Sequence, residues 1–260
     1  YLDNPYRLKH PLKRMGSRGE GKWKEISWDE ALDTVAGHLK KAKERYGAES
    51  VQMIRGGHKS GIIDGTLARF ANIFGTPNIA SMASVCWQPG VRASELTHGY
   101  LAVPDYEYPP QCIVVWGCDP SSTLISAYQD ILRVLQGTNR QARLIVIDPV
   151  RSKLVEKADV WIQLRPGTDL AFALGMIHVM IREDWVDQEF IDRWTAGYPE
   201  LKKHVEDYSP ERVSGITWVP SEKVIQAARL YALNKPACIQ WGNGVETNVN
   251  GLQTHRGIAI

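Results

Sequence analysis

Short apolar runs alternate with helix-like patterns along most of this chain, and this alternation constrains the fold most strongly. The runs are Val51–Ile54, Cys112–Trp116, Leu144–Ile147, Val160–Leu164 and Ala237–Trp241. The helical patterns between most of them are Gly61–Phe74, Ser122–Leu135, Leu170–Ile181 and Ser221–Leu233. A run that is apolar at every position suits a parallel strand covered by helices on both faces. The sequence therefore predicts an α/β fold with doubly wound, mostly parallel sheets.

The chain begins and ends differently from this regular middle. Residues 1–25 are rich in Lys, Arg and Gly and lack hydrophobic periodicity, which predicts an extended arm. Ser27 and Glu30 then form a capping-box pattern that opens a helix, and Gly47 ends it. The segment 191–220 is the least regular, because Gly and Pro interrupt it repeatedly. The chain lacks an initiator Met and a final helix stop signal, so we expect both ends to be cuts in a longer protein.

Composition and charge exclude several classes of function. The 260 residues contain 31 Lys and Arg against 29 Asp and Glu, a balance that does not favour binding to nucleic acid or to a membrane surface. No apolar run approaches the roughly 20 residues that span a bilayer, so direct membrane insertion is not expected. None of the four cysteines forms a CxxC pair, which disfavours a self-contained zinc or iron–sulfur site. The compartment, prokaryotic cytoplasm or periplasm, stays open.

The loops that follow the apolar runs carry residues suited to a nucleotide. In an open parallel sheet, ligands bind beyond the carboxyl ends of the strands. The five loops begin with Gly56-Gly57-His58, Gly117-Cys118-Asp119, Asp148-Pro149-Val150, Arg165-Pro166-Gly167 and Gly242-Asn243-Gly244. Glycines let a backbone approach phosphate closely, and Asp side chains accept hydrogen bonds from ribose or a base. Turn formation or helix capping explains any one loop, but five loops on one sheet edge favour a dinucleotide-sized ligand.

Two common nucleotide-binding classes are disfavoured by missing motifs. No GxGxxG follows the first apolar run, so a plain nicotinamide-binding domain loses its main support. The GxxxxGK[ST] phosphate loop of ATPases and GTPases is also absent. The predicted ligand is therefore a dinucleotide of another kind.

Several blocks, taken in order, resemble the molybdopterin oxidoreductase family, also called the dimethyl sulfoxide reductase family. The blocks are Asn4-Pro5-Tyr6-Arg7-Leu8, Arg18-Gly19-Glu20-Gly21-Lys22-Trp23, Gly117-Cys118-Asp119-Pro120, Ile147-Asp148-Pro149 with Arg151, and Arg165-Pro166-Gly167-Thr168-Asp169. The resemblance covers essentially the whole chain, and these blocks in register are far more specific than any one of them. It implies a bis-molybdopterin guanine dinucleotide cofactor holding molybdenum or tungsten. It also implies a [4Fe–4S] cluster in a missing N-terminal domain.

The resemblance assigns site residues position by position. Cys86, within Ser84-Val85-Cys86-Trp87, matches the protein ligand of the metal, and soft thiolate sulfur suits such a metal. From the residues alone, an inert buried thiol is the simpler interpretation. The residues that would contact one guanine dinucleotide are Gly117, Asp119, Ser121, Asp148, Pro149, Arg151, Pro166, Gly167, Thr168 and Asp169, with Asp169 the best candidate for guanine recognition. Gly242 and Asn243 match a loop near the pterin.

Other positions carry weaker predictions. His58, Arg92 and His98 are loose candidates for substrate or proton handling, although a surface or packing role explains each one singly. Trp87 stands where formate dehydrogenases of the family carry His, which disfavours formate as substrate. Asp119 replaces the Asn of many relatives, a change that alters one contact without abolishing binding.

The resemblance implies two-electron redox chemistry on a small-molecule substrate, with electrons leaving to an iron–sulfur cluster and an iron–sulfur partner subunit. Two alternatives stay open: a non-redox tungsten hydratase of the same family, and a cofactor-free scaffold like the large subunit of NADH–quinone reductase. The expected divisions are an arm and helix at 1–48, the first part of an α/β domain carrying Cys86 at 49–110, a Rossmann-like cofactor-binding domain at 111–241, and a return to the earlier domain at 242–260. We expect this piece to be inactive alone.

Overall fold

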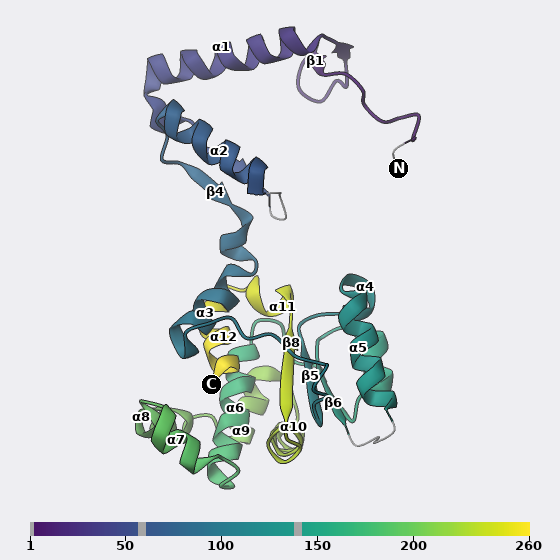
Figure 1. Cartoon of the computed structure of the whole chain (residues 1–260), viewed down its shortest axis with the longest axis vertical. Helices are drawn as coiled ribbons and strands as arrows, with labels where there is room; N and C mark the ends of the chain where they lie inside the picture. The colour runs from purple at the N-terminus through teal and green to yellow at the C-terminus, as the bar shows by residue number, and fades with distance from the viewer. Residues whose placement is uncertain (1–2, 57–60, 138–141) are drawn as a thin grey trace. The chain divides into compact units, whose positions relative to one another are not determined.

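The computed structural model describes residues 3–56, 61–137 and 142–260 and confirms the predicted α/β fold. The chain divides into two compact units, Tyr1–Met82 and Ala83–Ile260 (Figure 1). The expected division at 48, 110 and 241 stays a prediction, since a division by compactness does not test it.

The first unit contains two small sheets and two long helices. Its elements are β1 (Leu12–Arg14), β2 (Trp23–Glu25), α1 (Trp28–Tyr46), η1 (Ala48–Ser50), β3 (Met53–Arg55), α2 (Gly61–Phe74) and β4 (Ile79–Ser81). Strands β1 and β2 pair antiparallel, so the predicted arm contains a hairpin that its composition did not reveal. Strands β3 and β4 pair in parallel.

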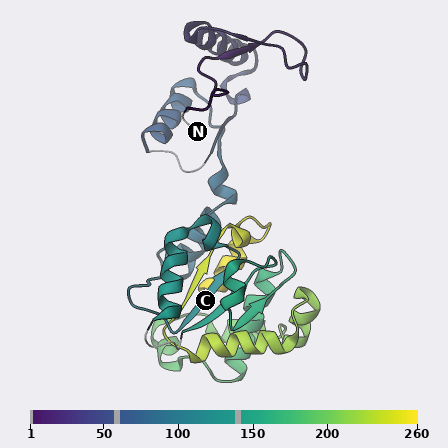
Figure 2. The same cartoon turned by 90° about the vertical axis from the view of Figure 1, so that its right-hand side faces the viewer.

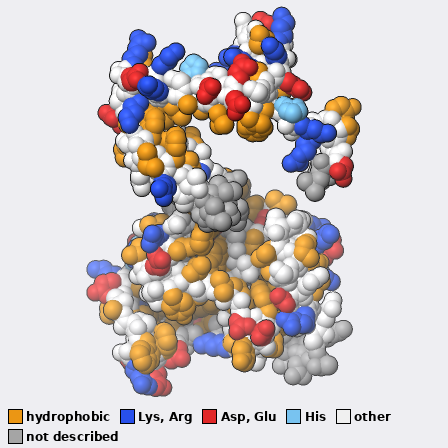
Figure 3. All heavy atoms as spheres, turned by 45° about the horizontal axis from the view of Figure 1, so that its top comes forward, with side chains coloured by type: hydrophobic (Ala, Val, Ile, Leu, Met, Phe, Trp, Pro, Cys, Tyr) orange, Lys and Arg blue, Asp and Glu red, His pale blue; other side chains and the backbone are white. Residues whose placement is uncertain are grey.

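Helix α1 begins and ends where its capping residues predict. The Ser27 hydroxyl accepts a hydrogen bond from the Glu30 amide at 3.1 Å. Gly47 follows the last turn at φ 86°, a left-handed value that favours glycine. No residue of α1 is buried, and its apolar residues Trp28, Leu32 and Val35 are exposed. Figure 3 shows hydrophobic side chains on the surface of this unit.

The second unit is built on a four-stranded parallel sheet. Its strands are β5 (Cys112–Trp116), β6 (Arg143–Ile147), β7 (Val160–Ile162) and β8 (Ala237–Trp241), and their spatial order is β7-β6-β5-β8. The chain moves outward from β5 through β6 to β7, then returns to place β8 on the other side of β5. This reversal makes the gap between the carboxyl ends of β5 and β8 a topological switch point, where open α/β sheets bind ligands.

Helices cover both faces of this sheet. The helices of the second unit are α3 (Gln88–His98), α4 (Pro120–Thr123), α5 (Ile125–Gln136), α6 (Asp169–Arg182), α7 (Gln188–Trp194), α8 (Tyr198–Val205), α9 (Pro210–Thr217), α10 (Ser221–Leu233), α11 (Asn243–Glu246) and α12 (Gly251–Ala259), with 3-10 turns η2 (Met82–Val85) and η3 (Lys153–Lys157). Ile113 and Val115 pack with Ile131 of α5. Val114 and Trp116 point the other way, toward α6 and α10, so successive residues of β5 serve opposite faces. Figure 2 shows α10, in yellow-green, crossing the sheet.

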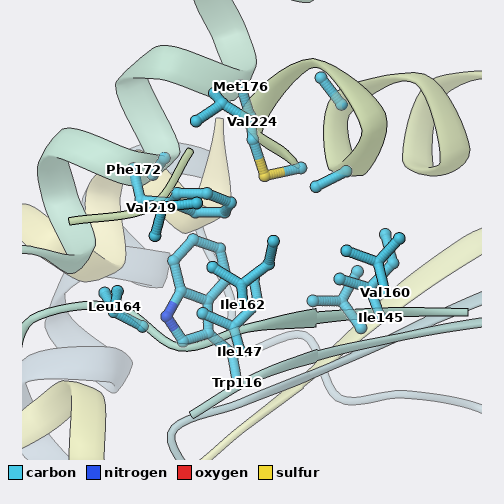
Figure 4. Packing of buried hydrophobic residues seen from close by; sticks show 14 of the residues in the cluster. Trp116, Ile145, Ile147, Val160, Ile162, Leu164, Phe172, Met176, Val219 and Val224 are labelled. Carbon is cyan, nitrogen blue, oxygen red and sulfur yellow. The ribbon is translucent and has the colours of Figure 1, made fainter. Parts of the chain in front are cut away.

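The larger core lies between the sheet and the helices α6, α9 and α10. Trp116 and Phe172 meet there edge to face, with ring centroids 5.8 Å apart and an interplanar angle of 79°. Figure 4 shows this pair beside Ile147 and Ile162, which are also fully buried. The core therefore fixes the carboxyl end of β5, where the predicted ligand loops begin.

Two predictions about local structure are wrong. The five ligand loops do not share one sheet edge, because β3 pairs with β4 in the first unit, whereas the other four strands form the sheet of the second. The segment 191–220 is not irregular: the helices α7, α8 and α9 occupy most of it. Most of its Gly and Pro residues mark helix starts, as Pro210 does in the first turn of α9, whereas Gly215 lies inside that helix.

Candidate functional site

The switch point between β5 and β8 is a place of close backbone approach. A Cβ atom at Gly244 would lie 2.6 Å from the Gly117 carbonyl oxygen, and one at Gly242 would overlap the Cys118 side chain. Gly117 itself has φ +58°, in the left-handed region. The structure therefore brings Gly117 and Gly242 together, because a side chain at either position would clash with the facing loop.

Three predicted carboxylates influence one another at this edge. Asp119 precedes α4 and accepts hydrogen bonds from the Ser121 amide at 3.1 Å and the Ser121 hydroxyl at 2.6 Å. Burial opposes ionisation of Asp119, but the bonds from Ser121 and Ser122 outweigh it and lower its pKa. Burial raises the pKa of Asp148, and the charges of Asp119 and Asp169 add to this increase. The edge is thus acidic, and it suits hydrogen-bond donors such as ribose hydroxyls and guanine.

Asp169 is the most constrained of these carboxylates. It is 7% exposed, begins α6, and accepts a hydrogen bond from Trp116 Nε1 at 2.8 Å. Burial raises its pKa, while that hydrogen bond opposes the shift. Because Trp116 is locked in the core, Asp169 is held in one orientation. A carboxylate fixed in this way suits the two N–H donors on one edge of guanine.

The loop after β6 contains a polar atom that the sequence did not single out. Ser152 is 9% exposed, and its hydroxyl has no hydrogen-bond partner among the described residues. The neighbouring Arg151 is exposed and available to an anion. The Pro149 carbonyl accepts from Gln163 Nε2 at 3.0 Å, which ties this loop to the end of β7. The Ser152 hydroxyl and the Arg151 guanidinium are both hydrogen-bond donors that suit the oxygens of a phosphate.

The loop after β7 is shaped by its own hydrogen bonds. Thr168 donates its hydroxyl proton to the Arg165 carbonyl at 2.6 Å, so it closes the loop instead of capping α6. Gly167 has φ +82°, and a Cβ there would lie 3.7 Å from the Asn248 side chain. Pro166 is exposed. The loops that follow β7 and β8 therefore approach each other.

The predicted metal ligand lies beside the predicted pterin loop. Cys86 is partly buried just before α3, and its sulfur is 3.7 Å from the Asn243 amide oxygen. The two residues are 157 positions apart in the chain, so the fold brings them together. This contact was not visible in the sequence, where the two residues were predicted separately.

The looser candidates are less closely grouped. Arg92 pairs with Glu95 on the exposed side of α3, with Arg92 Nη1 to Glu95 Oε2 at 2.6 Å. His98 contacts Tyr100, with ring centroids 4.9 Å apart, and it lines a cavity with His255. His58 lies outside the described residues. In the part of the chain that the structure describes, neither Arg92 nor His98 makes a hydrogen bond or ion pair with Cys86, so their predicted roles gain no support from contact with it.

Two cavities adjoin this site on the side of β8. One of about 250 Å³ is lined by Asn243, Glu246 and Trp87. The other, of about 260 Å³, is lined by His98 and His255. Both are lined by Trp241, Val103 and Pro104. Glu246 and His255 were not predicted from the sequence, because a lone acid or base in a helical pattern carries no motif.

The residues present fit a dinucleotide-bearing cofactor. At the switch point, glycines let the loops approach each other closely. The Ser152 hydroxyl, which has no partner among the described residues, suits a phosphate or sugar, and the fixed Asp169 carboxylate suits a base. Cys86, near the first residue of the same unit, supplies a sulfur donor. Among the described residues, no group of three or more His, Cys, Asp or Glu could hold a bare metal ion.

The fold and this edge define an α/β protein with a ligand site at a sheet switch point. Residues 7–259 match the family model for molybdopterin oxidoreductase. The chain belongs to the molybdopterin oxidoreductase family, which confirms the resemblance.

Three relatives illustrate the match. The chain is 36% identical over 256 residues to acetylene hydratase of Syntrophotalea acetylenica, covering 98% of this chain and 34% of the relative. It is 33% identical over 294 residues to a probable dimethyl sulfoxide reductase chain of Escherichia coli, covering 100% and 35%. The solved structure of acetylene hydratase from Pelobacter acetylenicus superposes with a TM-score of 0.82 at 35% identity, over 99% of this chain and 35% of that one.

The chain thus spans about a third of the length of these relatives. No helix among the described residues is long and apolar enough to cross a membrane.

Proposed function

We propose that this chain is part of a molybdenum or tungsten enzyme that binds bis-molybdopterin guanine dinucleotide and carries out two-electron redox chemistry on a small substrate. The observation that carries the proposal is the contact between Cys86 and Asn243 next to the β5–β8 switch point. Cys86 is the metal ligand in this proposal. The cofactor, when bound, supplies a metal that changes oxidation state by two electrons.

The chain's own residues bind and orient that group. Gly117 and Gly242 let the loops after β5 and β8 pack closely against each other, and Ser152 and Arg151 offer a hydroxyl and a cation to phosphate. Asp169, fixed by Trp116, accepts the guanine N–H donors. Asn243 lies beside Cys86, with its amide oxygen 3.7 Å from the sulfur. A [4Fe–4S] cluster and an iron–sulfur subunit, both outside this chain, receive or supply the electrons.

Hydration without net redox is the second candidate. The similarity to acetylene hydratase, at 36% identity and a TM-score of 0.82, favours it. The two candidates share the cofactor and Cys86, and they differ in whether electrons leave the site. An assay that counts the electrons transferred therefore distinguishes the two candidates.

The first test is metal and guanine nucleotide analysis of the full-length protein purified without oxygen. About one Mo or W with two guanine dinucleotides per chain is expected. The Cys86→Ala variant should keep the nucleotide and lose or weaken the metal. The matched control Cys238→Ala, on β8, should retain both. Neither metal nor nucleotide in a matured preparation would overturn the proposal and support a cofactor-free scaffold.

A second assay separates the two candidate reactions. Redox catalysis requires an artificial electron donor or acceptor, whose colour change counts the electrons transferred. Hydration of acetylene proceeds with no net electron transfer to a dye. Product formation that stops when the dye is withheld supports redox catalysis. Product formation from acetylene that is independent of any electron acceptor would overturn it in favour of hydration.

A further inference from the structure

A buried acid and a buried base lie side by side behind the proposed cofactor loop. Glu246 ends α11 and is 4% exposed, and His255 lies in α12 and is 3% exposed. Glu246 Oε1 and His255 Nε2 are 3.7 Å apart. The His255 ring meets the Trp241 ring edge to face, with centroids 5.4 Å apart. Burying two titratable groups is costly unless they serve each other or a reaction.

Helix α3 makes room for this pair by presenting a glycine. A Cβ at Gly90 would lie 2.8 Å from Glu246 Oε1, 3.2 Å from His255 Cε1 and 3.2 Å from Trp241 Nε1. Any larger residue would displace the acid, the base and the indole together. The pair is therefore enclosed by α3, α11, α12 and the end of β8, and only small movements of its own side chains are available.

The pair stands between the two cavities. Glu246 lines the one that also contains Gly242 and Asn243, and Asn243 contacts Cys86. His255 lines the one that also contains His98. Trp241 lines both. One member of the pair thus lines the cavity beside the proposed cofactor loop, and the other lines the neighbouring cavity.

The charge state of the pair leaves it one proton near neutrality. Burial raises the pKa of Glu246 to about 7, against a hydrogen bond from Trp241 that lowers it. Burial lowers the pKa of His255 to about 4. The pair is therefore an uncharged acid beside an uncharged base, rather than an ion pair, over much of the range between these values.

Few other charges act on the pair. On α3, Arg92 and Glu95 neutralise each other, and His98 lines the cavity of His255. Asp169 begins α6, which packs against α12. On α12 itself, Arg256 is exposed and bonded to Gln253.

We propose that Glu246 and His255 form a proton-transfer pair that connects the cavity at Asn243 with the cavity at His98. The O–H bond of Glu246 breaks and an N–H bond forms on His255 Nε2, leaving a carboxylate and an imidazolium. The imidazolium then gives its proton to water in its own cavity, and Glu246 takes a proton from the Asn243 side. No electrons move. The inference rests on the proposed function, because a two-electron reaction near Cys86 is what would release or consume these protons.

The distance sets a condition on this step. A separation of 3.7 Å is longer than a direct hydrogen bond, so the two side chains must approach by less than about 1 Å before the proton moves. The unpartnered Nε2 atom of His255 is aimed at Glu246, and no other described group competes for it.

The test uses the full-length protein and two substitutions that keep size but remove titration, Glu246→Gln and His255→Gln. Controls are Glu222→Gln and His204→Gln, which remove an exposed acid on α10 and an exposed imidazole on α8. Infrared spectra recorded across pH should show a protonated carboxyl band that disappears with a midpoint near 7. The band should vanish in Glu246→Gln, move its midpoint in His255→Gln, and persist in both controls.

Turnover gives the second readout. Both pair variants should keep the metal and nucleotide content of the wild type, lose about a hundredfold in turnover, and change the solvent hydrogen isotope effect. Wild-type turnover and isotope effect in a loaded Glu246→Gln protein would overturn the proton-transfer role, as would absence of the carboxyl band in the wild type. If the wild type holds no cofactor, the proposed function fails, while the infrared titration still decides whether the pair exchanges a proton.

Discussion

The absence of a side chain at Gly244 lets the loop after β8 pack against the backbone of Gly117. A Cβ at Gly244 would meet the Gly117 carbonyl at 2.6 Å, and backbone cannot move aside as a flexible side chain can. Gly244→Ala should therefore destabilise the protein by about 1–3 kcal/mol, the usual cost of overpacking. Gly215→Ala in α9 is the matched control, because no described atom lies within 4 Å of its Cβ. It should stabilise the helix by about 0.5–1 kcal/mol.

Urea unfolding midpoints of the two variants measure this difference. Opposite shifts are expected. Equal shifts in the same direction would show that the approach of the loops at Gly117 is not rigid.

Glu246 and His255 should also shape the dependence of stability on pH. The pKa of Glu246 is raised from 4.5 to about 7, so its stabilising contribution is complete below about pH 4.5 and is lost as pH rises through about 7. The pKa of His255 is lowered from 6.5 to about 4, so its contribution is complete above about pH 6.5 and is lost as pH falls through about 4. Between about pH 4 and pH 7, a rise in pH therefore removes the stabilising contribution of Glu246 and adds that of His255.

Glu246→Gln removes the pH-dependent contribution of Glu246 to stability and leaves that of His255. Relative to the wild type, the variant should gain about 1–3 kcal/mol of unfolding free energy when pH is raised from about 5 to about 8, because Gln has no charge to bury. Denaturant unfolding at several pH values measures the difference. A difference between variant and wild type that does not change with pH would contradict the raised pKa of Glu246.

For single residues, the sequence predicted which side chains serve as candidate ligands better than it predicted the contacts that the fold gives them. Asp169 was predicted as a ligand for guanine, but its bond to Trp116, 53 residues away, depends on the folded core. Glu246 and His255 were missed for the same reason, since each is buried by α3, which lies far away in the sequence. Burial by distant elements leaves no local pattern.

At the scale of elements, Asp119 combines a capping role with a proposed cofactor role. Asp119→Ala should cost about 1 kcal/mol of stability, because α4 loses the cap on the Ser121 amide. The same change should reduce the guanine nucleotide content of the full-length protein. Ser209→Ala is the matched control: it removes the cap on the Arg212 amide of α9, away from the site, at a similar cost in stability.

Nucleotide analysis beside thermal unfolding distinguishes the two roles of Asp119. Ser209→Ala should lower stability and leave nucleotide content unchanged. If both variants lose nucleotide in proportion to their loss of stability, Asp119 is a helix cap and nothing more.

Element prediction succeeded where local signals are strong and failed where they conflict. The limits of β5, β8, α2 and α10 agree with the apolar patterns, because a continuous apolar run and helical spacing are both local. The helix predicted over Ser122–Leu135 is interrupted at Leu124, where φ is −141°, and it appears as α4 and α5. Helices α7 to α9 were missed because each is short and Gly and Pro flank it. The pairing of β3 with β4 could not be predicted, since strand order depends on contacts distant in sequence.

At the scale of the whole molecule, the two units differ in how much apolar surface they bury. The three hydrophobic clusters found among the described residues all lie in the second unit. In the first unit, α1 exposes Trp28, Leu32 and Val35 by 64%, 62% and 57%. Such a stripe at helical spacing is typical of a face that another segment covers. The local pattern predicted this helix correctly, but it could not indicate what covers the helix.

Hydrogen exchange should reveal this difference in the isolated 260-residue polypeptide. Amides of α1 should exchange at least about a hundredfold faster than those of α6, because α1 has no buried residue and opens without exposing a core. Helix α6, with eight buried residues, is the matched control, and β5 should be protected at least as well. In the full-length protein, α1 should gain protection while α6 changes little. Protection of α1 equal to that of α6 in the isolated polypeptide would mean that the helix is stabilised without a partner for its apolar face.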